Sequence, residues 1–553
     1  MIVDASALER ATVLEGDVAV VGAGPAGIVV ALELARAGVD VLLVESGAVK
    51  PSAESQRLAD AAQWDPERHL ALADATRRQI GGATVIWGGR CVPYDPIDFE
   101  PRDLHGTNWP VSYAEIASFF ARACDWFVCG RPVFDASCVS HLPETIVPGL
   151  PNDEVLSSNL ERWSLPTNFG KVYESELRAS PRVRTVTSLT CVEFVCTDGS
   201  SRVDRLEARR LDGEPVRVRA RKYVLACGGL GTTRLLLASD RDRPGGLGNH
   251  SQHLGRWYMG HISGRIARVQ FSAPPDQTIY GHERDVDGVY VRRRFSFSPE
   301  ALRRHRLPNI VAFLANPELA DPSHRSGVLS FAYLVLASPF GRRVLSEPIR
   351  KSLIRRAEPG ALPSHLRNIV RDVGPTAAFA LTFAYKRFVA YRRAPGFFVQ
   401  SDANRYLMHY HGEQLPNAES SVSLTNERDA LGMRKLRIDL RYTAADVDAV
   451  MRAHRLLDDH LRRHGAGYLD YVVDDVEASV WRQAGDGCHQ LGTTRMAAAA
   501  ADGVVDRNLA VHGFDDLYVA SSSAFVTSSQ ANPAFTTVAF ALRLADHLRA
   551  QLA

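Results

Sequence analysis

The chain has 553 residues, of which 45% are hydrophobic and 23% are charged. This composition is typical of a folded globular protein and excludes a largely disordered one. The 65 basic and 63 acidic residues nearly cancel, so the net charge gives no support for a nucleic-acid partner. The length exceeds that of one ordinary hydrophobic core, and we expect two closely joined domains.

Cysteine spacing and the apolar segments bear on the compartment. The eight cysteines form no C-x-x-C pair and show no zinc-like spacing, which indicates reduced thiols in a reducing compartment. Residues 1–17 are acidic and polar, unlike a signal peptide. The longest apolar stretches, such as residues 374–385, are shorter than the ~20 residues that a membrane span needs. We therefore expect a soluble, cytoplasmic protein without a transmembrane segment.

The first strongly patterned segment, residues 17–47, predicts a complete βαβ unit. An apolar strand leads into Gly22-x-Gly24-x-x-Gly27, an alanine-rich helix follows, and a second apolar strand ends at Glu45. In such a loop the first glycine permits a tight turn, the second lets the backbone approach a pyrophosphate, and the third allows close packing of helix on strand. Glu45 stands where a carboxylate binds the ribose hydroxyls. The unit predicts a dinucleotide site but does not by itself distinguish FAD from NAD.

Two further segments contain glycine pairs. Residues 81–90, GGATVIWGGR, place four glycines around Trp87. Glycine pairs mark backbone that adopts positive φ or comes close to a large group, so this run is either a platform for a flat ring system or an ordinary glycine-rich loop. Residues 223–237 predict another strand of the same parallel sheet, then a glycine turn with Gly228 against the cofactor, then a helix. The nucleotide domain therefore resumes after a long excursion of the chain.

The C-terminal end is the most informative part of the sequence. It contains GCHQLGTTRM at residues 487–496 and a segment over residues 503–548 that includes a predicted strand at 517–520 and a serine turn. Asn532-Pro533 then opens an amphipathic helix, with the proline at the first helical position. The N-terminus of this helix offers unpaired N–H groups.

These segments together resemble the glucose-methanol-choline (GMC) flavoprotein oxidoreductases. The resemblance rests on the Gly22 loop, the run at residues 81–90, the H-x-x-G-T-x-R-M motif at His489 and the closing N-L-x-V-H-G and A-N-P signatures, which occur in the family's order. It implies an α/β fold, in which a Rossmann-like FAD-binding domain is assembled from three segments and accompanied by an α+β, sheet-containing substrate domain. The expected FAD-binding segments are residues 1–95, 185–265 and 485–553, and the expected substrate segments are residues 96–184 and 266–484.

The family's catalytic pair corresponds to His489 and Asn532 in this chain. A neutral imidazole, whose pKa in water is about 6.5, is suited to take the hydroxyl proton of an alcohol as its hydride leaves. Asn532 can hold the substrate oxygen by hydrogen bonding. The resemblance thus implies FAD-dependent oxidation of a sugar, polyol or secondary-metabolite CH-OH group, with oxygen or another acceptor reoxidising the flavin. The alternatives are redox-neutral lyase or decarboxylase chemistry of the same family and a non-catalytic role in a biosynthetic assembly.

The resemblance also implies how the cofactor is held. Ile86 stands where some members carry a histidine bonded to FAD, so we expect non-covalent binding. Ser521 replaces a common aspartate, and Val526 replaces a common proline. The helix that begins at Pro533 would stabilise reduced flavin by about 0.3 to 2 kcal/mol. The expected FAD-binding residues are Gly22, Gly24, Gly27, Glu45, Gly81, Gly82, Trp87, Cys191, Gly228, Ser521 and Pro533.

The substrate half of the chain is less informative. His409, His411 and Glu413 would share one face of a strand, where they could line the substrate pocket, bind a metal or simply be polar residues of a sheet; we expect no metal. The segment 338–393 interleaves basic and apolar residues, which fits a solvated helical face, a lid or a surface for anionic lipid or polysaccharide, and we favour the solvated face. Its basic residues include Arg342, Arg343, Arg350, Lys351, Arg355 and Arg356.

Overall fold

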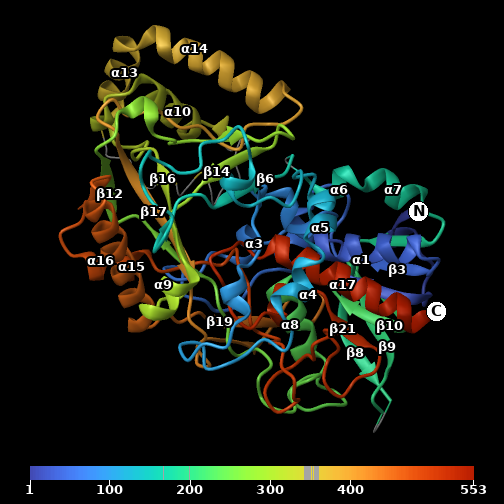
Figure 1. Cartoon of the computed structure of the whole chain (residues 1–553). Coiled ribbons are helices and arrows are strands. Elements are labelled where there is room, and N and C mark those ends of the chain that lie inside the picture. The colour runs from blue at the N-terminus through green and yellow to red at the C-terminus, as the bar shows by residue number, and fades with distance from the viewer. Residues whose placement is uncertain (166, 198–199, 342–349, 351–352, 354–359) are drawn as a thin grey trace.

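The computed structural model describes residues 1–553 except 166, 198–199, 342–349, 351–352 and 354–359 (Figure 1). A mixed eight-stranded sheet lies near both termini, and a five-stranded antiparallel sheet lies towards the opposite end of the molecule. Helices accompany both sheets, and each sheet has its own hydrophobic core. The structure thereby confirms the predicted α/β fold with a second, sheet-containing domain.

Parallel pairing forms the centre of the eight-stranded sheet. β2 (Val13–Val21) pairs in parallel with β3 (Val41–Val44) on one side and with β10 (Pro215–Leu225) on the other, and β10 also pairs in parallel with β21 (Leu517–Val519). All four residues of β3 are buried and apolar, as expected of a parallel strand covered on both faces. The sheet order is β1-β7-β3-β2-β10-β9-β8, with β1 (Ile2–Asp4), β7 (Val183–Thr187), β9 (Val203–Arg210) and β8 (Leu189–Cys196).

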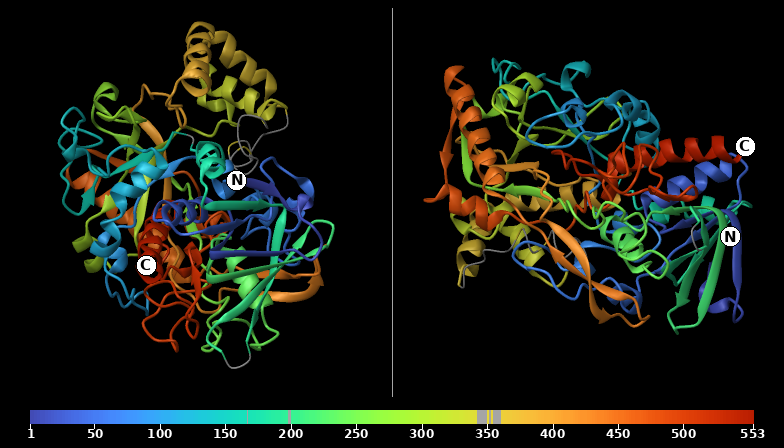
Figure 2. Two further views of the ribbon diagram at one scale, coloured as in Figure 1. Left: turned by 90° about the vertical axis from the view of Figure 1, so that its right-hand side faces the viewer. Right: turned by 90° about the horizontal axis from the view of Figure 1, so that it is seen from below.

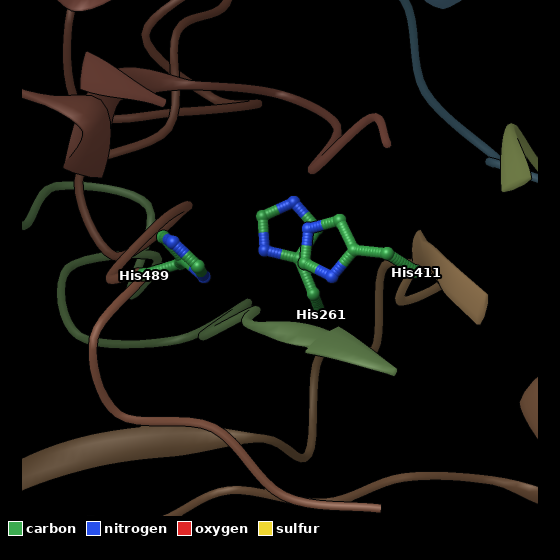
Figure 3. Close-up of side chains that lie close together, drawn as sticks. All are labelled: His261, His411 and His489. Carbon is green, nitrogen blue, oxygen red and sulfur yellow. The ribbon is translucent and has the colours of Figure 1, made fainter. Parts of the chain in front are cut away.

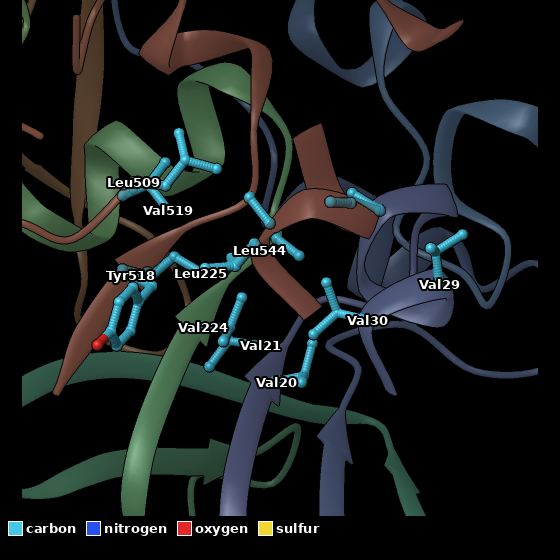
Figure 4. Packing of buried hydrophobic residues seen from close by; sticks show 14 of the residues in the cluster. Val20, Val21, Val29, Val30, Val224, Leu225, Leu509, Tyr518, Val519 and Leu544 are labelled. Carbon is cyan, nitrogen blue, oxygen red and sulfur yellow. The ribbon is translucent and has the colours of Figure 1, made fainter. Parts of the chain in front are cut away.

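Two long helices pack together over the central strands. α1 (Pro25–Arg36) contributes Val29 and Val30, and α17 (Ala534–Leu552) contributes Leu544, beside apolar side chains of β2 and β10 (Figure 4). The strand β2 is longer than the strand predicted at residues 17–21, because it pairs with β10 from Val13 onwards. The predicted βαβ unit is therefore present, and β10 and β21 extend its parallel sheet.

The five-stranded sheet is entirely antiparallel. Its order is β11 (His261–Gly264), β17 (Arg405–Glu413), β12 (Ala267–Phe271) and β20 (Gly467–Tyr471), with β16 (Ile310–Ala315) also paired to β17. α15 (Ala444–Arg463) begins after a Thr443–Asp446 capping box and buries its apolar face in the second core. The domain boundaries stay predictions, and the one placed at residue 265 lies after β11, which belongs to this second sheet.

Smaller elements connect the two sheets. β4 (Arg90–Cys91) follows the glycine run and enters a four-stranded sheet with β6 (Leu160–Trp163), β14 (Tyr290–Arg293) and β13 (Glu283–Arg284). All eight cysteine thiols are free. The other elements include α2 (Ala53–Arg57), α3 (Leu72–Ala75), α4 (Tyr113–Ala117), α5 (Phe120–Phe127), α6 (Phe169–Val172), α7 (Glu174–Ala179), α8 (Gly229–Ala238), α9 (Pro299–Arg304), α16 (Val476–Gln483), and the strand pairs β5 (Val155–Leu156) with β15 (Ser296–Phe297) and β18 (Ser421–Arg428) with β19 (Arg434–Asp439).

Three helices project from the second sheet at the top of Figure 1. They are α10 (Gly327–Ala337), α13 (Leu362–Arg371) and α14 (Val373–Ala384), and Figure 2 shows α13 and α14 standing out from the body of the molecule. Arg350 is buried and donates a hydrogen bond to the Leu336 carbonyl, so it does not belong to the expected solvated face. The other basic residues predicted for that face lie outside the described residues: Arg342, Arg343, Lys351, Arg355 and Arg356. Among the described helices, none is both long and apolar enough to cross a membrane.

Candidate active site

The glycine loop after β2 leaves open space at the N-terminus of α1. Gly22 has φ +103°, and a Cβ at Gly27 would lie 1.9 Å from the Gly22 carbonyl oxygen. Those two glycines are therefore required by the loop itself. A Cβ at Gly24, in contrast, would meet nothing closer than 4.0 Å. Because Gly24 is the N-cap of α1, the free space lies where a phosphate would reach the unpaired N–H groups of the helix.

The second glycine run rests directly on this loop. The Gly81 N–H donates to the Ala23 carbonyl at 2.8 Å. A Cβ at Gly82 would lie 2.8 Å from the Cα atom of Gly24. Both Gly81 and Gly82 have positive φ, at +98° and +52°. The structure thus brings the two predicted glycine segments together and favours a close approach of backbones over an ordinary surface loop.

Glu45 closes the nucleotide end of the site. It is buried after β3, and its two carboxylate oxygens accept the N–H groups of Ala23 at 2.8 Å and Gly47 at 2.7 Å. Burial raises the pKa of Glu45, although these two hydrogen bonds oppose the change. Each carboxylate oxygen keeps a second acceptor position, as needed to bind two ribose hydroxyls. Cys191 is buried on β8, where burial and the nearby Cys227 and Glu45 raise the pKa of its thiol.

The remaining cofactor candidates lie where separate segments meet. Gly228 has φ +76° and caps α8, and a Cβ on the next residue, Gly229, would lie 2.4 Å from the Gln490 carbonyl oxygen. The chain beside His489 therefore packs against the N-terminus of α8. The hydroxyl of Ser522, which follows Ser521, donates to that same Gln490 carbonyl at 2.8 Å. Trp87 is partly buried and donates to the Thr167 carbonyl at 3.3 Å.

We predict that Gly24→Ala folds normally but loses FAD affinity by about 10- to 100-fold. A methyl group fits the loop itself, since the nearest protein atoms are 4.0 Å away, whereas it occupies space that a pyrophosphate needs. Flavin fluorescence titration of the apoprotein measures the affinity. Gly374→Ala is the matched control, because a Cβ there also meets nothing within 4 Å; equal affinities of the two variants would contradict the prediction.

His489 is oriented by a buried carboxylate three residues earlier in the chain. Its Nδ1 lies 2.9 Å from Oδ2 of Asp486, and its side chain is 19% exposed. Burial would raise the pKa of Asp486, but His489 and His261 outweigh burial and hold it well below its usual range. An ionised carboxylate can only accept, so Nδ1 of His489 carries the hydrogen and Nε2 is left to take a proton.

Two further histidines stand beside His489 in Figure 3. The ring of His261 is perpendicular to that of His489 at a centroid distance of 4.6 Å, and the ring of His411 stacks on His261 at 4.4 Å. Burial lowers the pKa of both His261 and His411, so both are neutral. Within the described part of the chain, their Nε2 atoms are buried without a hydrogen-bond partner, as expected of groups that line a site for a polar ligand.

The structure does not assemble the metal site considered for the β17 strand. His409 stacks on Phe313 at 4.9 Å, and Glu413 pairs with His105 at 3.1 Å. Among the described residues, one nitrogen atom each from His261, His411 and His489 lie within 4.8 Å of one another. The absence of a metal stays a prediction.

A buried ion-pair network lies next to these histidines. Glu161 on β6 pairs with Arg90 at 2.7 Å and with Arg292 at 2.6 Å. Burial would raise the pKa of Glu161, but the two arginines outweigh it and lower that pKa to about 2. Arg90 also contributes to the lowered pKa values of His261 and His411. This network was not predicted from the sequence, because its members come from three separate strands.

Asn532 lies at the start of α17. The helix begins at Ala534 with Pro533 as its N-cap, one position later than predicted, within the usual uncertainty of helix ends. The Oδ1 atom of Asn532 is buried, and no described residue bonds to it. The preceding segment is held rigidly, because Ser528 exchanges hydrogen bonds with the backbone of Gln414 at 2.9 and 3.0 Å. The Oδ1 atom of Asn532 is therefore held in a fixed place, and no described residue occupies it.

The fold, the dinucleotide loop and the joined glycine segments define a dinucleotide-binding protein. The FAD-binding domain family matches residues 15–56, and the GMC oxidoreductase family matches residues 416–541. The chain therefore matches the GMC oxidoreductase family over its C-terminal part and the FAD-binding domain family at its nucleotide loop, and its cofactor is FAD. The buried Oδ1 atom of Asn532, which has no partner among the described residues, and the open space at Gly24 are features that fit such a ligand.

Related proteins carry oxidase and dehydrogenase names. Paromamine 6'-oxidase of Streptomyces fradiae is 27% identical over 312 residues, which cover 48% of this chain and 57% of that protein. The chain thus matches little more than half the length of that relative. The 2-methyl-1,2-propanediol dehydrogenase of Mycolicibacterium austroafricanum is 22% identical and covers 96% of this chain and 95% of that one.

Solved structures share the fold over nearly the whole chain. A fungal aryl-alcohol oxidase superimposes with a TM-score of 0.53 at 16% identity and covers 97% of this chain and 99% of its own. Pyridoxine 4-oxidase from Mesorbium loti gives a TM-score of 0.51 at 16% identity, with coverages of 96% and 99%. Identities this low support the fold only.

Proposed function

We propose that the protein oxidises an alcohol to a carbonyl compound, with His489 as the base. The observation that carries this proposal is the hydrogen bond of 2.9 Å between Nδ1 of His489 and the ionised Asp486. It fixes the ring and leaves Nε2 as the proton acceptor in a partly buried position. Such an arrangement is typical of a general base.

The residues expected to hold the cofactor divide by function. The glycine loop and the N-terminus of α1 would bind the pyrophosphate, Glu45 the ribose, and the run around Gly82 would border the space next to the loop. Bound FAD supplies the hydride acceptor. The protein's own contribution is to bind, to orient and to move a proton, because the redox chemistry itself belongs to the cofactor.

The proton and the substrate oxygen are assigned to two side chains. Nε2 of His489 takes the hydroxyl proton, and Asp486 stabilises the resulting imidazolium through Nδ1–H. The Nδ2–H group of Asn532 would donate to the substrate oxygen, and its Oδ1 atom, which has no partner within the described residues, stays free to accept from another group of the ligand. The neutral His261 and His411, whose Nε2 atoms have no partner among the residues that the structure describes, would bind a second hydroxyl of the substrate.

The proposed substrate is a polyhydroxylated compound such as a sugar, a polyol or a secondary metabolite. The relatives named for paromamine, hydroxyparomomycin C, 2-methyl-1,2-propanediol and fructose support this class. Anaerobic spectroscopy of the yellow protein with sugars, polyols and simple alcohols tests the proposal. Bleaching supports alcohol oxidation, and rapid recolouring in air identifies an oxidase. Turnover of a substrate without any bleaching contradicts it in favour of redox-neutral chemistry.

We predict that FAD is bound non-covalently. Ile86 has no nucleophilic atom, so acid precipitation should release all of the yellow colour into the supernatant. The Ile86→His variant provides the comparison, because it restores an imidazole next to Trp87. A yellow pellet from the unaltered protein would show a covalent link and contradict the prediction.

A further inference from the structure

Exposed apolar side chains gather on one part of the molecule. Of the eighteen exposed large hydrophobic side chains among the described residues, ten lie between Phe340 and Tyr391, which is less than a tenth of the chain. Single exposed hydrophobic residues are normal on a soluble protein, whereas a cluster of them marks an interaction site.

The helix α13 exposes its apolar face to water and buries polar residues. Leu362, Leu366 and Val370 follow one another at four-residue spacing and are all exposed, Val370 to 76%. The polar residues are packed inward instead. His365 forms a hydrogen bond of 3.0 Å with the hydroxyl of Ser330 on α10, and the buried Asn368 donates to the same hydroxyl. An amphipathic helix in contact with water only would have the opposite orientation.

The helix α14 differs from α13, because it is apolar on both its inner and its outer face. Phe379 and Phe383 stack on each other at 5.4 Å and pack against Phe397, so this face anchors the helix. The outer face carries Val373 and, eight residues later, Leu381, which is 76% exposed. The aromatic contacts of the inner face thus keep the apolar outer face exposed. Exposed Tyr385, Phe388, Val389 and Tyr391 continue it towards residue 391.

Charge identifies the partner of this face. Residues 361–396 contain a single acid, Asp372, which accepts the Gly327 N–H at 2.9 Å. Three of the basic residues are exposed and have no ion-pair partner among the described residues: Arg367, Lys386 and Arg393. The basic residues of this segment are Arg367, Arg371, Lys386, Arg387, Arg392 and Arg393. Exposed apolar and aromatic side chains flanked by unpaired cations are complementary to an anionic lipid surface.

We propose that residues 361–393, here called the apolar cap, bind peripherally to anionic membranes. Leu366, Val370 and Leu381 enter the boundary between headgroups and acyl chains, while Arg367 and Lys386 contact the headgroups. Both helices of the cap are too short to span a bilayer, so the cap lies on its surface. This property is independent of the reaction at His489.

Co-sedimentation with lipid vesicles tests this proposal. The FAD-loaded protein should sediment with vesicles of phosphatidylcholine and phosphatidylglycerol in a 3:1 ratio, about 10-fold or more above its binding to pure phosphatidylcholine, and added salt should weaken the binding. The triple variant Leu366→Asp/Val370→Asp/Leu381→Asp should lose this binding about 10-fold or more. All three positions are exposed, and retained FAD absorbance and an unchanged melting temperature establish that the variant is folded.

Matched substitutions separate a surface effect from an added charge. Val370→Asp alone should weaken binding, whereas Val13→Asp, at an exposed position of the eight-stranded sheet, should leave it unchanged. Three outcomes overturn the proposal. The protein stays in the supernatant with both kinds of vesicle; the triple variant sediments as well as the unaltered protein; or light scattering shows a dimer that the triple variant disperses without any vesicle binding.

Discussion

The His489→Ala variant is expected to retain FAD while its flavin is reduced by substrate roughly 100- to 10,000-fold more slowly. Asp486 fixes the ring of His489 through a hydrogen bond of 2.9 Å between its Oδ2 atom and Nδ1. Removal of the ring leaves the hydroxyl proton of the substrate without an acceptor. The cofactor contacts at the glycine loop lie elsewhere in the chain and are untouched. Anaerobic stopped-flow absorbance, with a substrate identified by bleaching, measures the rate.

An exposed histidine provides the control for this substitution. His250 contacts the His512 carbonyl at 3.1 Å and is exposed, so His250→Ala should reduce its flavin at the unaltered rate. Added free imidazole should partly restore the His489→Ala variant, because it returns a base to the vacated space. An unchanged rate in the His489→Ala variant would eliminate this residue as the base.

The nucleotide half of the fold could be predicted because its signals are local. The strand, the Gly22 loop, the helix and Glu45 follow one another within one βαβ unit, and backbone geometry dictates each glycine: a Cβ at Gly27 would lie 1.9 Å from a carbonyl oxygen. The capping box that begins α15 is a local signal of the same kind, because Thr443 and Asp446 are only three residues apart. The predicted and observed ends of these elements differ by a residue or more. The strand β2, for example, begins earlier than predicted because its length is set by its pairing with β10.

The substrate side could not be predicted because long-range pairing builds it. His261 reaches His411 only because β11 pairs with β17, and Glu161 meets Arg90 through the pairing of β4 with β6. Single-sequence spacing contains no information about such partners. Asp486 was within reach of the sequence, since a short carboxylate three residues before a histidine can bond to the intervening N–H groups.

The apolar cap shows a different limit of sequence patterns. A four-residue spacing of Leu362, Leu366 and Val370 predicts an amphipathic helix but not which face is packed inside the protein. Here tertiary contacts decide, because the polar His365 and Asn368 find partners on α10. The lipid-binding proposal for this basic segment therefore depends on the packing of its helices and not on its sequence alone.

The Asp486→Asn variant tests the orientation of the base rather than the base itself. An amide can donate to Nδ1 and so favour the tautomer with hydrogen on Nε2, which cannot take the substrate proton. It also removes the charge that stabilises the imidazolium. We therefore expect flavin reduction to slow by about 100- to 1,000-fold. This effect lies between that of losing a carboxylate that orients a metal-bound histidine and that of losing the aspartate of a Ser-His-Asp triad. Stopped-flow reduction at several pH values measures it.

The pH dependence distinguishes positioning from a merely structural role. The pKa of Asp486 lies well below its usual range, so its ionised form stabilises the folded site above the unfolded value of about 3.9 and this contribution is lost as the pH falls. In Asp486→Asn that acid-dependent loss should disappear, so the rate profile of the variant should differ from that of the unaltered protein at its acidic end. Asp475→Asn, a change at the exposed N-cap of α16, should leave the profile unaltered. If both variants keep the unaltered rate and profile, Asp486 does not set the tautomer of His489.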